Sequence, residues 1–92
     1  MKYVILKGGT IGSRRELYDA VAAHLTVPDY FGRNLDALQE VLLLDLLPKG
    51  PLTIEIEDYD EMRAKMGDYA VGLRRMLCDT ARIDPRLTVV FR

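Results

Sequence analysis

The sequence predicts an α/β fold in which a three-stranded parallel sheet packs with about four helices. Three short apolar segments, at residues 3–6, 52–56 and 87–91, have the composition of strands. Helical patterns fill both intervals, so the predicted order is strand, two helices, strand, two helices, strand. Helical crossovers between short apolar strands favour parallel pairing with right-handed connections. With two helices for each crossover, we expect the helices to crowd one face of the sheet.

The first segment, residues 3–6, is apolar and partly β-branched, and it stops at a glycine pair. Ser13 and Glu16 have the spacing of a capping box, in which each side chain accepts a hydrogen bond from an otherwise unpaired amide. This motif predicts a helix that runs to about Leu25. Its buried stripe is expected to be Leu17, Val21 and Leu25.

A loop at residues 28–33 separates this helix from the next, since the residue before a proline avoids helical geometry. Asn34 is a good N-cap for a second helix. The expected apolar stripe of that helix is Leu35, Leu38, Val41, Leu42 and Leu46. Residues 48–51 then form a turn before the strand at residues 52–56.

Two further helices are expected before the last strand. Residues 58–66 predict a short helix that ends at Gly67, and Asp68 is expected to cap a longer helix to about Arg82. The inward residues of the longer helix are expected to be Tyr69, Leu73, Met76 and Leu77. Asp84 and the proline after it then turn the chain into the strand at residues 87–91.

Length and composition restrict the possible classes of protein. Ninety-two residues predict a single domain, residues 1–92, with room for one core and one functional face. Cys78 is the only cysteine, so no internal disulfide can form, which suits a reducing compartment. The apolar runs, at most four residues long, are too short for a signal peptide or a membrane helix. We therefore expect a cytoplasmic protein that does not contact membranes.

The net charge of −1 conceals a strong asymmetry along the chain. Residues 29–61 carry nine acidic and two basic side chains, whereas residues 1–28 and 62–92 have net charges of +2 and +4. An acidic middle segment favours a basic protein partner and argues against a nucleic-acid groove in that segment. The simpler alternative is an acidic face that is merely solvated.

Three features that suggest enzymes have simpler structural interpretations. The glycine turn at residues 8–13 follows a strand and precedes a helix, as phosphate loops do, but it matches neither common phosphate-binding motif. His24 is the only histidine and lies at a predicted helix end, where a cation complements the helix dipole. Cys78 has no histidine near it in sequence and is expected to pack as a small apolar group.

Asp36 and Glu40 are four residues apart on the second predicted helix and therefore share its polar face. A pair of carboxylates can serve glycoside hydrolysis, but that chemistry needs a cleft and one desolvated acid. We interpret the pair instead as part of a surface that binds a cationic partner. The loop before this helix holds Tyr30 and Phe31, which suit the centre of an interface. The alternative is that one of them, Phe31 in particular, plugs the core beneath the helix.

The segment PDYFGRNLDAL, residues 28–38, resembles the loop-and-helix signature of the barstar family: proline, acid, two aromatics, glycine, any residue, then Asn-Leu-Asp-Ala-Leu. The similarity extends over nearly the whole chain. The resemblance implies a barstar-like fold of three parallel strands and four helices. It also implies an inhibitor of a guanyl-specific, barnase-type ribonuclease, which occludes the basic active site of the nuclease with an acidic loop and helix at about residues 28–45.

The resemblance also implies roles for single residues. Asp36 matches an inhibitory aspartate of the family, and Tyr30 matches the tyrosine that packs on the catalytic histidine of the nuclease. Gly32 and Asn34 match positions that set the path of the loop. Glu40 stands where the family has its most important aspartate and is one methylene longer.

Two matching positions lie outside this core of the motif. Asp79, on the last predicted helix, stands where the family has a peripheral glutamate, whereas Gln39 replaces a tryptophan. The partner-binding residues are therefore expected to be Tyr30, Phe31, Gly32, Asn34, Asp36, Gln39, Glu40 and Asp79.

The expected partner is a basic, extracellular-type ribonuclease bound 1:1 by a chain that is monomeric when free. The inhibitor itself is expected to have no catalytic residue, cofactor or metal and to bind no nucleic acid. An immunity or antitoxin role would follow from such an activity. The alternative is a binding module of the same fold for another basic protein or toxin.

Overall fold

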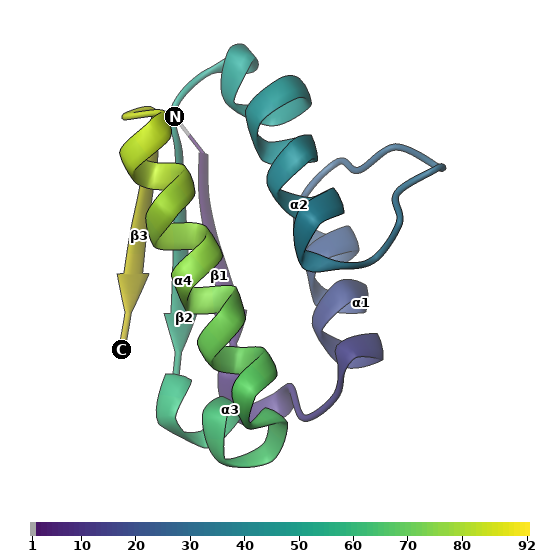
Figure 1. Cartoon of the computed structure of the whole chain (residues 1–92), viewed down its shortest axis with the longest axis vertical. Coiled ribbons are helices and arrows are strands. Elements are labelled where there is room, and N and C mark those ends of the chain that lie inside the picture. Colours follow the sequence, from purple (N-terminus) through teal and green to yellow (C-terminus); the bar gives the residue numbers. More distant parts are fainter. Residues whose placement is uncertain (1) are drawn as a thin grey trace.

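The protein, described by a computed structural model over residues 2–92, contains one three-stranded sheet (Figure 1). Strands β1 (Lys2–Lys7), β2 (Leu52–Glu57) and β3 (Leu87–Phe91) lie in the order β1-β2-β3. Both pairings are parallel, and the register aligns Val4 with Ile54 and Ile54 with Val89. The predicted parallel sheet and its central strand are confirmed.

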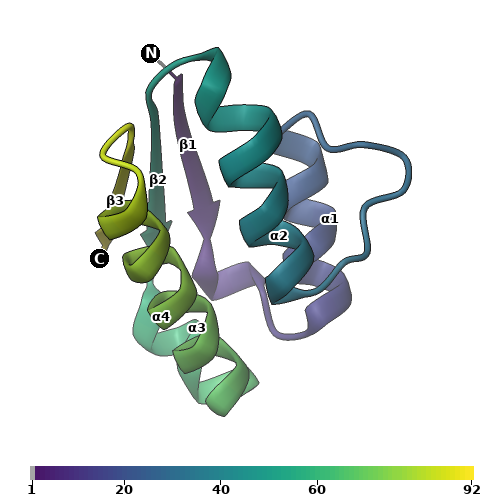
Figure 2. The same cartoon turned by 45° about the horizontal axis from the view of Figure 1, so that its top comes forward.

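Four α-helices accompany the sheet: α1 (Arg14–His24), α2 (Leu35–Val41), α3 (Tyr59–Met66) and α4 (Asp68–Ile83). The two views place all four to one side of the strands (Figures 1 and 2). The burial pattern of β1 agrees, since Val4 and Leu6 are buried whereas Tyr3 and Ile5 are 52% and 38% exposed. The helices therefore crowd one face of the sheet, as expected.

The N-terminus of α1 is capped nearly as the sequence predicts. The Ser13 hydroxyl accepts a hydrogen bond from the amide of Glu16 at 3.1 Å. The carboxylate of Glu16 accepts a hydrogen bond from the amide of Gly12, at 3.1 Å, rather than from that of Ser13. The predicted stripe of Leu17, Val21 and Leu25 is buried.

The second helix changes its geometry midway, which the sequence pattern did not indicate. α2 continues into a π-helical turn, η2 (Leu42–Leu46), and then into a 3₁₀ turn, η3 (Leu47–Lys49). Leu38, Val41 and Leu42 are buried as expected, but Leu35 and Leu46, at the two ends of the predicted stripe, are only half-buried. The wide turn holds more residues than an α-helical turn, so the side chains after Leu42 no longer follow the 3.6-residue stripe.

The boundary between α3 and α4 corrects one prediction. Gly67 has a φ of 61° and is the N-cap of α4, so Asp68 is the first residue of the helix and makes no capping hydrogen bond. The left-handed backbone of Gly67 reverses the chain and starts the helix one residue early. Leu73 and Leu77 on α4 are buried, and the predicted inward residues Tyr69 and Met76 are half-buried against the core.

The sheet face opposite the helices carries a small polar network. The Tyr3 hydroxyl donates a hydrogen bond to the carboxylate of Glu55, and the guanidinium of Arg92 lies 3.2 Å from the same carboxylate. The hydrogen bond from Tyr3, followed by the contact with Arg92, lowers the pKa of Glu55. Glu55 is only 7% exposed, so these partners compensate for the burial of its charge.

Candidate partner-binding site

The two loop aromatics point in different directions. The Phe31 ring packs edge-on against Tyr18, with 5.7 Å between ring centroids, and Tyr18 is 1% exposed in the core. The Tyr30 side chain, in contrast, is 82% exposed. Phe31 therefore plugs the core beside α2, which was the alternative interpretation, while Tyr30 stays available at the surface.

The loop enters α2 through a strained residue that is tied to α1. Arg33 has a φ of 53°, a left-handed conformation that disfavours residues other than glycine. Its guanidinium lies 2.6 Å from a carboxylate oxygen of Asp19. This ion pair joins the loop to α1, so it helps to hold Arg33 in that conformation.

The N-cap next to it orders the backbone around Gly32. The side-chain oxygen of Asn34 accepts a hydrogen bond from the amide of Ala37 at 2.8 Å, as the sequence predicts for an N-cap. The Asn34 amide nitrogen donates to the Gly32 carbonyl at 3.3 Å. A Cβ at Gly32 would lie 3.2 Å from that nitrogen and 3.4 Å from the Cβ of Ala37. Glycine is therefore favoured there by close approach, and the left-handed residue is its neighbour Arg33.

The two carboxylates of α2 are exposed to solvent. Asp36 lies in the first turn of the helix, where the helix dipole stabilises a negative charge, and Glu40 lies one turn later. Among residues 2–92, the ion pairs of the structure include neither carboxylate. Both groups can therefore accept hydrogen bonds from a partner without first losing one within the chain.

A groove of about 310 Å³ separates the loop from the outer face of α2 and η2. It is lined by Tyr30, Phe31, Gly32, Ala37, Glu40, Val41, Leu44 and Asp45. The groove thus joins four residues of the predicted site, namely Tyr30, Phe31, Gly32 and Glu40. Its walls combine apolar surface with two carboxylates, which suits the side chain of an arginine, a lysine or a histidine.

Leu44 and Asp45 belong to this groove, although sequence reasoning did not select them. Leu44 is 67% exposed, which is unusual for a large apolar side chain, and Asp45 is half-buried. One signal was present in the sequence: Leu44 follows Glu40 by four residues and lies outside the predicted apolar stripe. An apolar residue on the polar face of a helix is a candidate interface residue.

Gln39 on α2 and Asp79 on α4 do not line the groove, and Gln39 contacts α4. The Gln39 amide nitrogen donates to the Thr80 hydroxyl at 3.1 Å, and Gln39 is half-buried. The carboxylate of Asp79 lies 2.9 Å from the guanidinium of Arg82, one turn later on α4. These two side chains therefore have partners within the chain, unlike Asp36 and Glu40.

The glycine turn serves packing, consistent with its structural interpretation. Gly8 begins a 3₁₀ turn, η1 (Gly8–Thr10), and a Cβ there would lie 2.4 Å from the carbonyl oxygen of Glu57. A Cβ at Gly9 would lie 2.7 Å from a carboxylate oxygen of Glu61. The ammonium of Lys65 donates to the carbonyl of Gly9, so both a carboxylate and a cation lie at this turn and hold it against α3.

Residues 2–92 lack two features that would point to other functions. No group of three or more histidine, cysteine, aspartate and glutamate side chains is arranged to hold a metal ion. None of the described helices has both the length and the apolar character needed to cross a bilayer.

The chain is similar to known proteins over its whole length. The family model described as "Barstar (barnase inhibitor)" matches residues 1–92. A relative from Bacillus subtilis (strain 168), named "Putative ribonuclease inhibitor YrdF", is 35% identical over 72 residues, which cover 76% of this chain and 75% of the relative. Because the family model covers the whole chain, this chain belongs to the barstar family.

Proposed function

We propose that this protein inhibits a guanyl-specific, barnase-type ribonuclease by laying the loop at residues 28–34 and the outer face of α2 across the active site of the enzyme. The observation that carries the proposal is the groove between Tyr30 and Glu40, which joins the exposed carboxylate of Glu40 to exposed apolar surface. Asp36 does not line the groove and lies one turn before Glu40 on the same helix. The family and the named relative supply the class of partner. The chain itself acts by binding, without catalysis.

The electrostatics support this mode of inhibition. The active site of a ribonuclease is cationic because it binds phosphate, and carboxylates on a rigid helix can take the place of that phosphate. Hydrogen bonds between carboxylates and arginine or lysine are among the stronger ones in proteins. The loop is already held by the core contact of Phe31 and the cap of Asn34, so little ordering is needed on binding.

The test is calorimetric titration of the chain against a panel of guanyl-specific ribonucleases. We expect 1:1 binding that inhibits RNA cleavage. Asp36→Asn and Glu40→Gln should each weaken it by about 2–5 kcal/mol, the range found for truncated charge pairs in tight complexes. The double variant should show coupling, since both carboxylates face one cationic site. Asp60→Asn, which removes an exposed carboxylate from α3, is the matched control and should bind like the parent.

Salt separates the electrostatic contribution from the apolar one. The effects of the two carboxylate variants on association should shrink as salt rises, because exposed charges are screened within about 8–10 Å at 0.10–0.15 M salt. If Asp36→Asn and Glu40→Gln bound the ribonuclease as tightly as the parent, this face would not be the inhibitory site.

The chain's departures from the family pattern favour a second candidate, a binding module for another basic protein. Gln39 stands where the family has a tryptophan, and it is turned towards Thr80 on α4. An aromatic contact at that position is therefore absent. This candidate would be supported if no ribonuclease of the panel bound, while a non-ribonuclease toxin bound with the same sensitivity to Asp36→Asn and Glu40→Gln.

The setting follows from the proposed activity. An inhibitor of a secreted ribonuclease protects the cell that makes it only if it acts where the cell's own RNA lies. We therefore propose a cytoplasmic immunity role for a single-domain chain that is monomeric until it meets the nuclease. Sedimentation of the free chain and of the complex tests the monomer and the 1:1 stoichiometry directly.

A further inference from the structure

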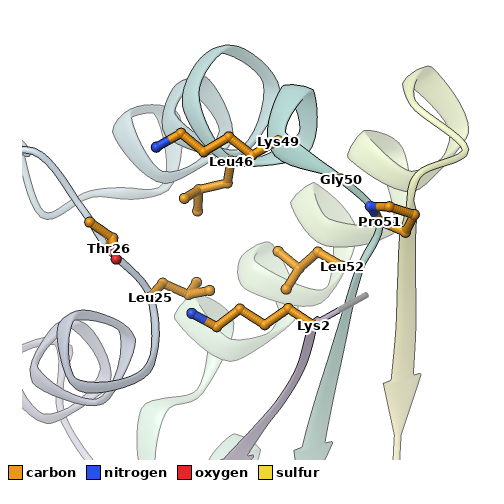
Figure 3. Close-up of a pocket in the computed structure, with 8 residues that line it drawn as sticks. All are labelled: Lys2, Leu25, Thr26, Leu46, Lys49, Gly50, Pro51 and Leu52. Atoms are coloured by element: carbon orange, nitrogen blue, oxygen red, sulfur yellow. The ribbon is translucent and has the colours of Figure 1, made fainter.

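A second pocket is lined by other residues than the acidic groove, and its charged side chains are basic. It has a volume of about 310 Å³ and is formed where the end of α1, the turn η3 and the first residues of β1 and β2 meet. Lys2 and Lys49 extend along its two sides, and their ammonium groups lie at the same end as the Thr26 hydroxyl (Figure 3). Among residues 2–92, the ion pairs of the structure include neither lysine.

The remainder of the pocket is apolar. Leu25 and Leu52 are 4% and 3% exposed, and Leu46, half-buried, lies between the stem of Lys49 and Leu25 (Figure 3). Pro51 lies at the end away from the ammonium groups (Figure 3). The pocket therefore has one cationic end with a hydroxyl and one apolar end.

Backbone hydrogen bonds order the two segments of the chain that carry the lysines. The amide of Lys2 donates to the carbonyl of Pro51 at 3.1 Å, which ties the start of β1 to the entry of β2. The amide of Gly50 donates to the carbonyl of Leu47 at 3.1 Å, which closes the turn that carries Lys49. The cationic end is thus built on ordered backbone from two separate segments of the chain.

We propose that this pocket binds a small amphipathic anion, with a carboxylate or phosphate head between Lys2 and Lys49 and a short apolar body against Leu25, Leu46 and Leu52. A pocket of this composition, mostly apolar with a few convergent polar groups, is typical of a small-molecule site. Its volume lies at the small end of the range for such sites, about 300–1,000 Å³. The acidic groove shares no lining residue with it, so the proposal does not depend on ribonuclease binding.

The first experiment uses two probes, hexanoate and hexyl phosphate, in an NMR titration of the whole chain. We expect saturable shifts at Leu25, Thr26, Leu46 and Leu52, with a dissociation constant of about 1 mM or below. Three further compounds serve as controls. Hexanol has the apolar body without a charge, hexylammonium carries the opposite charge, and inorganic phosphate is the head group without the body. Each should bind more weakly than the two probes. Tighter binding of one probe than the other identifies the preferred head group.

The lysines are tested by charge-neutral variants. The double variant Lys2→Gln/Lys49→Gln should weaken binding of the preferred probe about tenfold, because it removes both charged donors to the head. Thr26→Val should weaken it less, by a few-fold. Lys7→Gln is the matched control, since it removes a lysine at the other end of β1, and it should leave the affinity unchanged.

Three outcomes would overturn the proposal. The first is the absence of saturable shifts with either probe. The second is equal binding of hexanol, which would make the pocket a purely apolar cleft. The third is a double variant that binds the probe as tightly as the parent but melts at a lower temperature without ligand. The lysines would then stabilise the fold, by contacts with the carbonyl groups at the ends of α1 and η3, and would not bind the anion.

Discussion

The opposite orientations of Tyr30 and Phe31 predict that adjacent substitutions separate folding from binding. Replacing a fully buried phenylalanine by alanine lowers the free energy of unfolding by about 3–5 kcal/mol. Phe31 is buried over most of its surface but not completely, so roughly two thirds of that applies. Its edge-on contact with Tyr18 adds about 0.5–1.5 kcal/mol. We expect Phe31→Ala to lower the free energy of unfolding by about 2.5–5 kcal/mol.

Tyr30→Ala should weaken binding but leave folding stability nearly unchanged. The Tyr30 side chain is 82% exposed, so its removal should change the free energy of unfolding by no more than about 0.5 kcal/mol. If the loop binds as proposed, Tyr30 lies near the centre of the interface, and its loss should weaken binding by about 2 kcal/mol or more. This loss should depend little on salt, because the contact is apolar.

Urea denaturation followed by circular dichroism measures the first quantity, and calorimetric titration with the ribonuclease measures the second. Both measurements should be made on the same protein preparations. Equal losses of stability in the two variants would refute the division of roles described here. Unimpaired binding by Tyr30→Ala at full stability would remove Tyr30 from the interface.

Three further perturbations test the framework. Arg33→Gly should be more stable than Arg33→Ala by about 1 kcal/mol in urea denaturation, since both lose the ion pair to Asp19 but only glycine relieves the left-handed strain; equal stabilities would contradict this. The Tyr3 hydrogen bond lowers the pKa of Glu55 in the folded state. The charged Glu55 therefore stabilises the fold above the ordinary glutamate pKa, about 4.3, and this stabilisation is lost as pH falls through the lower folded pKa. Thermal melts over this pH range should show a weaker dependence of stability on pH in Glu55→Gln. Gly8→Ala should cost at least about 1–3 kcal/mol in urea denaturation, because its Cβ would lie 2.4 Å from a backbone carbonyl oxygen that cannot easily move; an unchanged midpoint would show that the turn adapts.

Strands and helix starts were predictable because their signals are local. The apolar segments lie within one residue of the strands of the sheet, and Ser13 and Asn34 cap the helices that they were expected to begin. Such signals depend on residues a few positions apart, which a sequence displays directly. The start of α4 was displaced by one residue because the backbone of Gly67, rather than the side chain of Asp68, makes the turn.

Part of the groove was missed because it depends on the wide turn η2, although Leu44 itself was visible in the sequence as an apolar residue on the polar face of the helix. A helical stripe is read at 3.6 residues per turn, and nothing in the run of leucines at residues 42–44 marks where that period changes. Leu47, which is 0% exposed, fixes the end of the turn through contacts that form only in the folded core. The predicted set therefore omitted Leu44 and Asp45.

Other features arise from residues that are distant in sequence. Gln39 contacts Thr80 across 41 positions in the sequence. Lys2 and Lys49 line one pocket because β1 and β2, to which they are adjacent in the chain, are neighbours in the sheet. A single sequence does not reveal such pairs. The exposure of Asp36 and Glu40, in contrast, was predictable from their place opposite the apolar stripe and is confirmed by the structure.

The contacts that shape the loop are made by different side chains from those that it displays. Phe31, Arg33 and Asn34 face the core, α1 and the helix cap, whereas Tyr30 and the carboxylates of α2 face solvent. Substitutions in the outward set therefore cost little folding stability and change what the surface recognises. A chain built in this way can exchange its target over evolutionary time through a few changes, while the scaffold that presents the loop stays the same.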